Sequence, residues 1–178
     1  MSKLKELTWE NHSKAERTEH ARKLLKGMTP EEYHRYLYNQ YVQYAAVESV
    51  AHSRGVLEGI EHICRADAIR ADMTELEVEY DIQRNEDLLC PVVNRYAAHV
   101  TSLQDTDDIL AHLYVRHFGD MYGGQMIRKR NPGAGTMYDF NDVEELKATV
   151  RAKLNDDMAD EANRCFEFAM ELFEELGE

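Results

Sequence analysis

The sequence is short of residues that interrupt helices and of cysteines that crosslink secreted folds. It contains three prolines, and it has no run of about 18 apolar residues that would cross a membrane. Its cysteines, Cys64, Cys90 and Cys165, are odd in number and lack C-x-x-C spacing. We therefore expect free thiols in a reducing cytosol, and a soluble, cytoplasmic protein without a disulfide framework or a signal peptide.

Basic residues are also scarce. Lysine and arginine number 21 against 34 aspartates and glutamates, which gives a formal net charge of −13. A chain with this charge is not expected to bind nucleic acid or an anionic membrane surface. Glutamate, lysine, leucine and alanine are abundant, and 178 residues suffice for one sizeable core. We expect a single all-α domain spanning residues 1–178, a multi-helix bundle that stays monomeric because no exposed apolar stripe is evident.

Helix signals recur along the chain. A first helix is expected from Ser2 through Glu16, and a short second one is ended by Gly27. Thr29 and Pro30 open a long helix that should end near residue 55, with the glutamate at position 32 completing a capping box. Later helices are expected over 72–79 (with Leu76 and Tyr80 turned inward), from 91, from 105 or 106, from 141 (capped by residues 141–144), and over 161–176.

Three glycines stand within six residues of a stretch that otherwise has the pattern of a helix: Gly119, Gly123 and Gly124. Glycine inside a helix costs about 0.5–1 kcal/mol relative to alanine. A kink, or the close approach of something flat to a backbone without Cβ atoms, would explain the cost. On spacing alone, a loosely specified bend or a helix ending at the glycine pair is equally acceptable. Asp120 lies among the glycines, and Arg116 lies one turn earlier on the same face.

Two other helical faces carry candidate binding residues. Lys5, His12 and Glu16 share one face of the first helix. A lone histidine is more often structural than a ligand, but Glu16 is placed to accept the Nδ1 proton and leave Nε2 free for a metal. Lys5 would reach an anion beside the same face. Lys147 and Arg151 share a face of a later helix, where a solvated basic surface is the simpler explanation.

The sequence motifs in these segments resemble those of the heme oxygenases. Tyr-x-Arg-x-x-Gly-Asp-x-x-Gly-Gly-Gln, beginning at Tyr114, is similar to their distal-helix motif. Residues 5–16 look like the proximal helix whose histidine ligates heme iron, and Lys147-x-x-x-Arg151 resembles the propionate-binding helix. The resemblance runs from residue 5 to the C-terminus, is weak only over 56–100, and is closest to the soluble bacterial, cyanobacterial and phage forms. Val115 stands where the family often has a polar residue, and Tyr122 where it often has a small one.

The resemblance implies an oxidoreductase that opens heme b with O2 and external electrons to give biliverdin IXα, CO and Fe2+. It implies heme held between a proximal N-terminal helix and a glycine-kinked distal helix. A ferredoxin is the implied electron donor, and a bilin reductase is a candidate downstream partner in bilin biosynthesis. The implied catalytic residues are Arg116, Gly119, Asp120 and Gly123. The implied metal ligand is His12. The implied heme-binding residues are Lys5, His12, Glu16, Tyr114, Gly119, Gly123, Gly124, Lys147 and Arg151.

Two other functions stay open at this stage. A heme carrier would use His12 but perform no ring chemistry. A helical non-heme iron enzyme on a related fold would need carboxylates from several helices and repeated Glu-x-x-His motifs. Glu58, Glu61 and His62 lack that spacing, so we expect a solvated acidic helix there. We expect His117 to be peripheral, since it lies roughly 200° round the helix from the backbone that the glycines expose.

Overall fold

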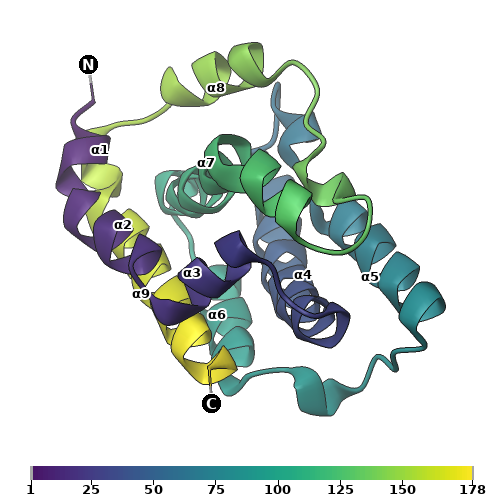
Figure 1. The fold of residues 1–178 in the computed structure, drawn as a ribbon. Coiled ribbons are helices and arrows are strands. Elements are labelled where there is room, and N and C mark those ends of the chain that lie inside the picture. The colour runs from purple at the N-terminus through teal and green to yellow at the C-terminus, as the bar shows by residue number, and fades with distance from the viewer. Residues whose placement is uncertain (1, 178) are drawn as a thin grey trace.

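The computed structural model describes residues 2–177, and every regular element within that range is helical (Figure 1). The expectation of an all-α fold is confirmed. No helix in the described range is long and apolar enough to cross a membrane. The α-helices are α1 (Leu4–Leu7), α2 (Trp9–Glu16), α3 (Glu19–Lys26), α4 (Pro30–Ser53), α5 (Ala66–Tyr80), α6 (Pro91–Ser102), α7 (Thr106–Arg130), α8 (Val143–Arg151) and α9 (Ala159–Leu176). Short 3-10 turns are η1 (Glu61–Ile63), η2 (Glu86–Leu88), η3 (Thr136–Tyr138) and η4 (Asp156–Met158).

The N-terminal helix differs from the single helix expected from Ser2. It begins at Leu4 and is interrupted at Thr8, which divides it into α1 and α2. The Thr8 hydroxyl donates to the Leu4 carbonyl at 2.9 Å, a local hydrogen bond of the kind that competes with regular helix. The α2 helix then lies along α9, where the Asn11 amide donates to the side-chain oxygen of Asn163 at 3.1 Å (Figure 1).

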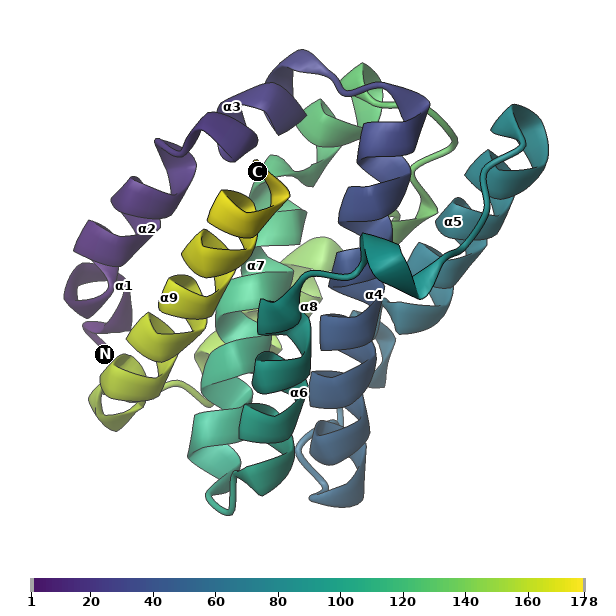
Figure 2. The ribbon, with the colours of Figure 1, turned by 90° about the horizontal axis from the view of Figure 1, so that it is seen from below.

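The second and third helices form as expected. Gly27 ends α3 with φ of 113°, a conformation that favours glycine. Thr29 caps α4, accepting from the backbone N–H of Glu32 while the Glu32 carboxylate accepts from the backbone N–H of Thr29. Figure 2 shows α9, α7, α6 and α4 running beside one another, with α5 packed on the outer side of α4. The long helix α4 therefore packs directly beside α7.

Three expectations in the outer elements are wrong. Residues 55–59 form turns and η1 follows them, so the acidic helix expected around Glu61 is absent from the described chain. Tyr80 is 39% exposed, because it is the last residue of α5 and lies beyond the buried stripe that ends at Leu76. Asp142 precedes α8 in a left-handed conformation and makes no side-chain cap.

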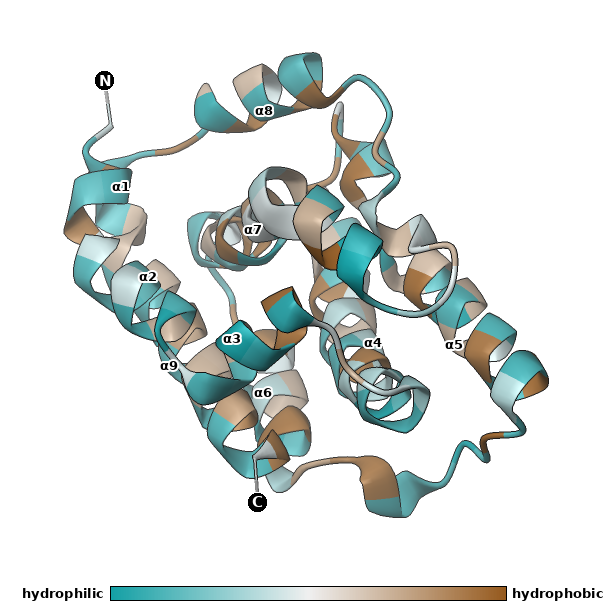
Figure 3. Ribbon diagram, in the orientation of Figure 1, coloured by the Kyte–Doolittle hydropathy of each residue, from teal (hydrophilic) through white to brown (hydrophobic). Residues whose placement is uncertain are grey.

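Figure 3 shows polar and apolar residues alternating round α5, which is typical of a helix packed on one side.

The glycine-rich helix is continuous. Asp105 caps α7 by accepting from the backbone N–H of Asp107 at 2.9 Å, and the helix runs through all three glycines to Arg130. The helix therefore does not end at the glycine pair, which was one of the alternatives left open by the sequence. Asn131 follows the helix and binds its last turn through the Ile127 carbonyl at 2.9 Å.

Candidate functional site

The three glycines of α7 have two different surroundings. A Cβ atom built on Gly119 or Gly123 would meet no other heavy atom within 4 Å, and these residues lie one turn apart on the same face. A Cβ on Gly124 would overlap the ring of Tyr138, which is fully buried in η3. Gly119 and Gly123 thus present bare backbone to open space. Gly124 makes room for a tyrosine on another side of the helix, and its expected contact with heme stays a prediction.

Asp120 lies beside this bare backbone and is buried. The Tyr44 hydroxyl of α4 donates to its Oδ2 at 2.6 Å. Burial raises the pKa of Asp120 to about 6, although the nearby His117, the hydrogen bond from Tyr44 and the charge of Arg116 oppose the rise. A carboxyl group with this pKa exchanges a proton near neutral pH, which suits a general acid.

Arg116 is buried one turn before Asp120 but binds other partners. Its Nε donates to the Tyr96 hydroxyl at 2.9 Å, and one terminal nitrogen donates to Oε1 of Gln43 at 2.7 Å. Its guanidinium also lies over the Tyr96 ring, 4.1 Å from the centroid. Arg116 therefore joins α7 to α6 and α4, and Tyr44 is the side chain that reaches the Asp120 carboxyl. Sequence reasoning missed Tyr44, Gln43 and Tyr96, since spacing alone does not tell a core tyrosine or glutamine from a partner of a buried charge.

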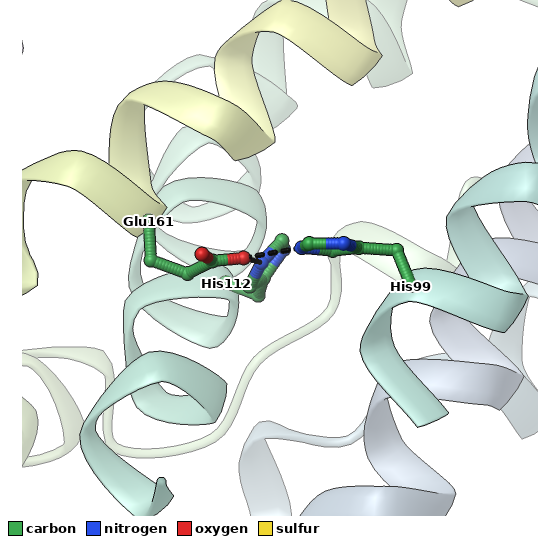
Figure 4. Close-up of side chains that lie close together, drawn as sticks. All are labelled: His99, His112 and Glu161. Atoms are coloured by element: carbon green, nitrogen blue, oxygen red, sulfur yellow. Dashed lines mark hydrogen bonds and ion pairs between the residues drawn. The ribbon is translucent and has the colours of Figure 1, made fainter. Parts of the chain in front are cut away.

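A polar cluster of His99, His112 and Glu161 continues this network (Figure 4). The Tyr96 hydroxyl lies 2.8 Å from Nδ1 of His112, and Nε2 of His112 lies 2.8 Å from Oε1 of Glu161. Nε2 of His99 lies 2.5 Å from the same oxygen. Burial disfavours protonation of His112, but contacts with Cys165 and Glu161 raise its pKa to about 9. Burial likewise disfavours ionisation of Glu161, but hydrogen bonds from the two histidines lower its pKa to about 2.

Two imidazoles and a carboxylate are also ligands that zinc accepts, and one candidate ligand atom from each of the three residues lies within 4.8 Å of the others. Ligands of one tetrahedral zinc would stand roughly 3.3 Å apart, given bonds of about 2.0 Å. The distances from Glu161 to the two histidines, 2.5 and 2.8 Å, are those of hydrogen bonds. We therefore interpret the cluster as one carboxylate that bridges two imidazoles. This bridge links α6 and α7 to α9.

His12 is the histidine that the resemblance implies as the iron ligand, and it is accessible to solvent. Its side chain is 40% exposed, and its ring stacks on Trp9 at 5.4 Å and lies 5.6 Å from the ring of Phe166 in α9. Glu16 binds His12 as expected, but through Nε2 at 2.6 Å and not through Nδ1. The free ring nitrogen is thus Nδ1, and a half-turn of the imidazole exchanges the two positions.

Two further histidines, His117 and His20, are enclosed. His117 was expected to be peripheral to the glycine backbone; it is fully buried, with Nδ1 3.1 Å from the Leu113 carbonyl and Nε2 2.8 Å from Oε2 of Glu48. Both of its ring nitrogens are therefore occupied. His20 stacks on Phe173 at 4.8 Å, and burial together with the charges of nearby cations lowers its pKa to about 4. Neither residue presents a free imidazole as His12 does.

The expected propionate-binding cations lie on α8, which Figure 1 shows above α7 and whose Leu146 and Val150 are buried in the main core. Lys147 is buried and Arg151 is exposed, and both approach Tyr122 of α7. Tyr114 lies two turns earlier on α7 and is half-buried. Lys5 is exposed on α1, which packs against η4, the turn that follows α8.

The chain is similar over nearly its whole length to known heme oxygenases. A "Heme oxygenase 1" of Synechocystis is 29% identical and is aligned over 98% of this chain and 83% of that protein. A "Heme oxygenase 2" of Macaca fascicularis is 27% identical over 97% of this chain, which spans only 64% of that longer protein. The crystal structure of the Synechocystis sp. PCC6803 heme oxygenase-1 in complex with heme matches with a TM-score of 0.82 at 24% identity, covering 97% and 90% of the two chains. The structure of the Leptospira interrogans heme oxygenase matches with a TM-score of 0.81 at 24% identity, covering 96% of each chain. The sequence model of the heme oxygenase family matches residues 1–175, and the chain belongs to that family.

Proposed function

We propose that this protein opens the porphyrin ring of heme, using O2 and external electrons, to give biliverdin IXα, CO and Fe2+. The observation that carries the proposal is the pairing of bare helix backbone at Gly119 and Gly123 with a buried, proton-holding carboxyl at Asp120. Membership of the heme oxygenase family supports the same reaction.

The residues present fit heme, which is flat, apolar and edged by two carboxylates. The missing Cβ atoms of Gly119 and Gly123 allow a planar ring to approach the helix. The exposed imidazole of His12 is available to bind iron. Lys147, Arg151 and Lys5 are cations available for the propionates. Heme supplies the iron at which O2 binds, and the protein supplies position and protons.

Within this proposal, Asp120 holds the proton that the reaction consumes. Its burial keeps a fraction of the carboxyl protonated near neutral pH, and Tyr44 fixes the orientation of the carboxyl by donating to Oδ2. Arg116 acts at a distance, because its hydrogen bonds to Tyr96 and Gln43 hold α7 against its neighbours. Gly119 and Gly123 act through the close approach that they permit. If heme binds there, the bare backbone of Gly119 and Gly123 would let its ring lie close to the helix, and the heme would supply the oxidative chemistry that opens its own ring.

The electron donor and cellular setting are proposed from the similarity to cyanobacterial relatives. We propose a small iron–sulfur ferredoxin as the donor and a bilin reductase as a downstream partner. We further propose a cytoplasmic monomer, consistent with cysteine thiols that form no disulfide within the described chain.

Hemin titration followed by addition of a reductant and O2 tests the function. A Soret band on titration is expected, whereas a non-heme iron enzyme would give none. Formation of a bilin is expected, whereas a heme carrier would retain heme unchanged. Asp120→Ala should bind hemin nearly as tightly as the parent protein and lose at least about a hundredfold of the ring-opening rate, as removal of a general acid does. Asp67→Ala, which removes an exposed carboxylate of α5, is the matched control. Normal bilin formation by Asp120→Ala would refute the role of this carboxyl.

A further inference from the structure

Tyr122 occupies an unusual place beside the open glycine face. It lies between Gly119 and Gly123 in sequence, and 61% of its surface is exposed even though its ring is bound on two sides. It ends a row of rings along α7, in which Tyr114 and Phe118 are 5.0 Å apart and Phe118 and Tyr122 are 6.1 Å apart. This row faces α8, so Tyr122 connects the glycine backbone to that helix.

Both cations of α8 converge on the Tyr122 ring. The ammonium of Lys147 stands over it, 3.9 Å from the centroid. The guanidinium of Arg151 donates to the Tyr122 hydroxyl and lies 5.6 Å from the ring of Phe118. Contacts of this kind between a cation and an aromatic ring are favourable. Tyr122 thereby contacts both cationic side chains of α8.

The charge of this cluster is poorly compensated. Lys147 has a side chain that is only 8% exposed, and its carboxylate neighbour, Glu144, lies 3.7 Å away and is 89% exposed. Arg151 gives its hydrogen bond to a neutral phenol. Two cations brought together in this way attract an anion.

The phenol adds a donor to the two cations. The Tyr122 oxygen accepts from Arg151, so its own O–H proton remains available to a further acceptor. A carboxylate has two oxygens and accepts several hydrogen bonds, which matches an ammonium, a guanidinium and a hydroxyl at one place. The arrangement is therefore suited to one carboxylate group at the edge of a ligand that lies on Gly119 and Gly123.

We propose that Tyr122 is the third donor of a carboxylate clamp with Lys147 and Arg151, and that this clamp holds one heme propionate and so sets which meso carbon is opened. The inference rests on the proposed function for the identity of the ligand. Holding one propionate fixes the rotation of the ring about the axis through the iron. Tyr122 is accordingly a specificity-determining residue.

Tyr122→Phe is the informative variant, because it removes the hydroxyl and keeps the ring beneath Lys147. Tyr80→Phe, at the exposed end of α5, is the matched control. Hemin and hemin dimethyl ester, in which both propionates are esterified, are titrated into each heme-free protein. Products of the hemin complexes are separated by chromatography after reduction in O2.

We expect Tyr122→Phe to bind hemin about tenfold more weakly than the parent, the loss of one hydrogen bond to a charged group, and to yield mixed bilin isomers. The two proteins should bind the dimethyl ester equally, and Tyr80→Phe should match the parent throughout. Equal hemin affinity and an unchanged isomer would overturn the clamp. A loss of affinity as large for the ester as for hemin would also overturn it, since the hydroxyl would then act on something other than a carboxylate. The two titrations require no ring opening, so they decide the clamp even if the parent forms no bilin and the proposed function fails.

Discussion

The hydroxyl of Tyr44 lies 2.6 Å from Oδ2 of Asp120 and joins the middle of α4 to the glycine segment of α7. Both residues are buried, so this hydrogen bond is shielded from solvent. Tyr44 also lies 3.4 Å from the Arg116 carbonyl, one turn earlier on the same helix. A single phenol thus positions the carboxyl and contacts the backbone that precedes it.

Replacing Tyr44 by phenylalanine should shift the pH dependence of ring opening upward. The hydrogen bond from Tyr44 lowers the pKa of Asp120 against the effect of burial, so its loss should raise that pKa further above about 6. If protonated Asp120 supplies the proton, activity falls as pH rises through its pKa, and the fall should occur at higher pH in Tyr44→Phe. Single-turnover bilin formation measured across pH tests this. Asp120→Asn, which cannot titrate, should lack the transition, and a transition at the same pH in Tyr44→Phe and parent would contradict the coupling.

Replacing His12 by alanine should abolish most bilin formation, and added imidazole should restore part of it. The expectation follows from the exposure of this imidazole and from the enclosure of His117 and His20. The Soret spectrum of the hemin complex and the bilin yield are the measurements, with and without imidazole. His62→Ala, at an exposed position in η1, is the control. Full activity of His12→Ala without imidazole would assign the ligand to another residue.

The sequence predicted the helices better than it predicted the polar contacts around the site. Capping residues such as Thr29 act on their immediate neighbours, so a short stretch of sequence is enough to predict where the helix begins. The partners of Asp120 and Arg116 come from α4 and α6, 20 or more residues away in sequence, and only the packing of three helices reveals them. The same limit explains Gly124, whose role depends on the Tyr138 ring.

The bridge of His99, His112 and Glu161 should make stability depend on pH in both directions. The pKa of Glu161 is about 2 when folded and near 4.5 otherwise, so its contribution is present above pH 4.5 and is lost as pH falls through about 2. The pKa of His112, raised first by Cys165 and then by Glu161, is about 9 when folded and near 6.5 otherwise, so its contribution is present below pH 6.5 and is lost as pH rises through about 9. The bridge should therefore stabilise the fold most between pH 4.5 and 6.5.

Urea unfolding of Glu161→Gln at several pH values tests this bridge. The variant should lose most free energy of unfolding, relative to the parent, near the middle of that window and least above about pH 9. Glu167→Gln, on the exposed face of α9, is the control and should show a small, nearly pH-independent change. A loss for Glu161→Gln that is the same at every pH would show that the bridge contributes through packing and not through charge.

Alanine at Gly123 and at Gly124 should have opposite effects. In the heme-free protein, Gly123→Ala should raise the free energy of unfolding by about 0.5–1 kcal/mol, because alanine favours helix and its Cβ meets open space. Gly124→Ala should lower that free energy by about 1–3 kcal/mol, since the Cβ overlaps the buried ring of Tyr138.

The two alanine substitutions should rank differently in hemin affinity than in stability: the more stable variant should bind hemin more weakly. The methyl group of Gly123→Ala occupies the space through which a planar ring approaches the helix, so hemin should bind more weakly although the heme-free protein is more stable. Gly124→Ala should retain hemin affinity at temperatures where it is folded, because its methyl group points toward η3. Urea unfolding of the heme-free proteins and hemin titration of the same samples give both quantities. Unchanged hemin affinity in Gly123→Ala would mean that the ring does not lie against this backbone, and the open face of α7 would need another occupant.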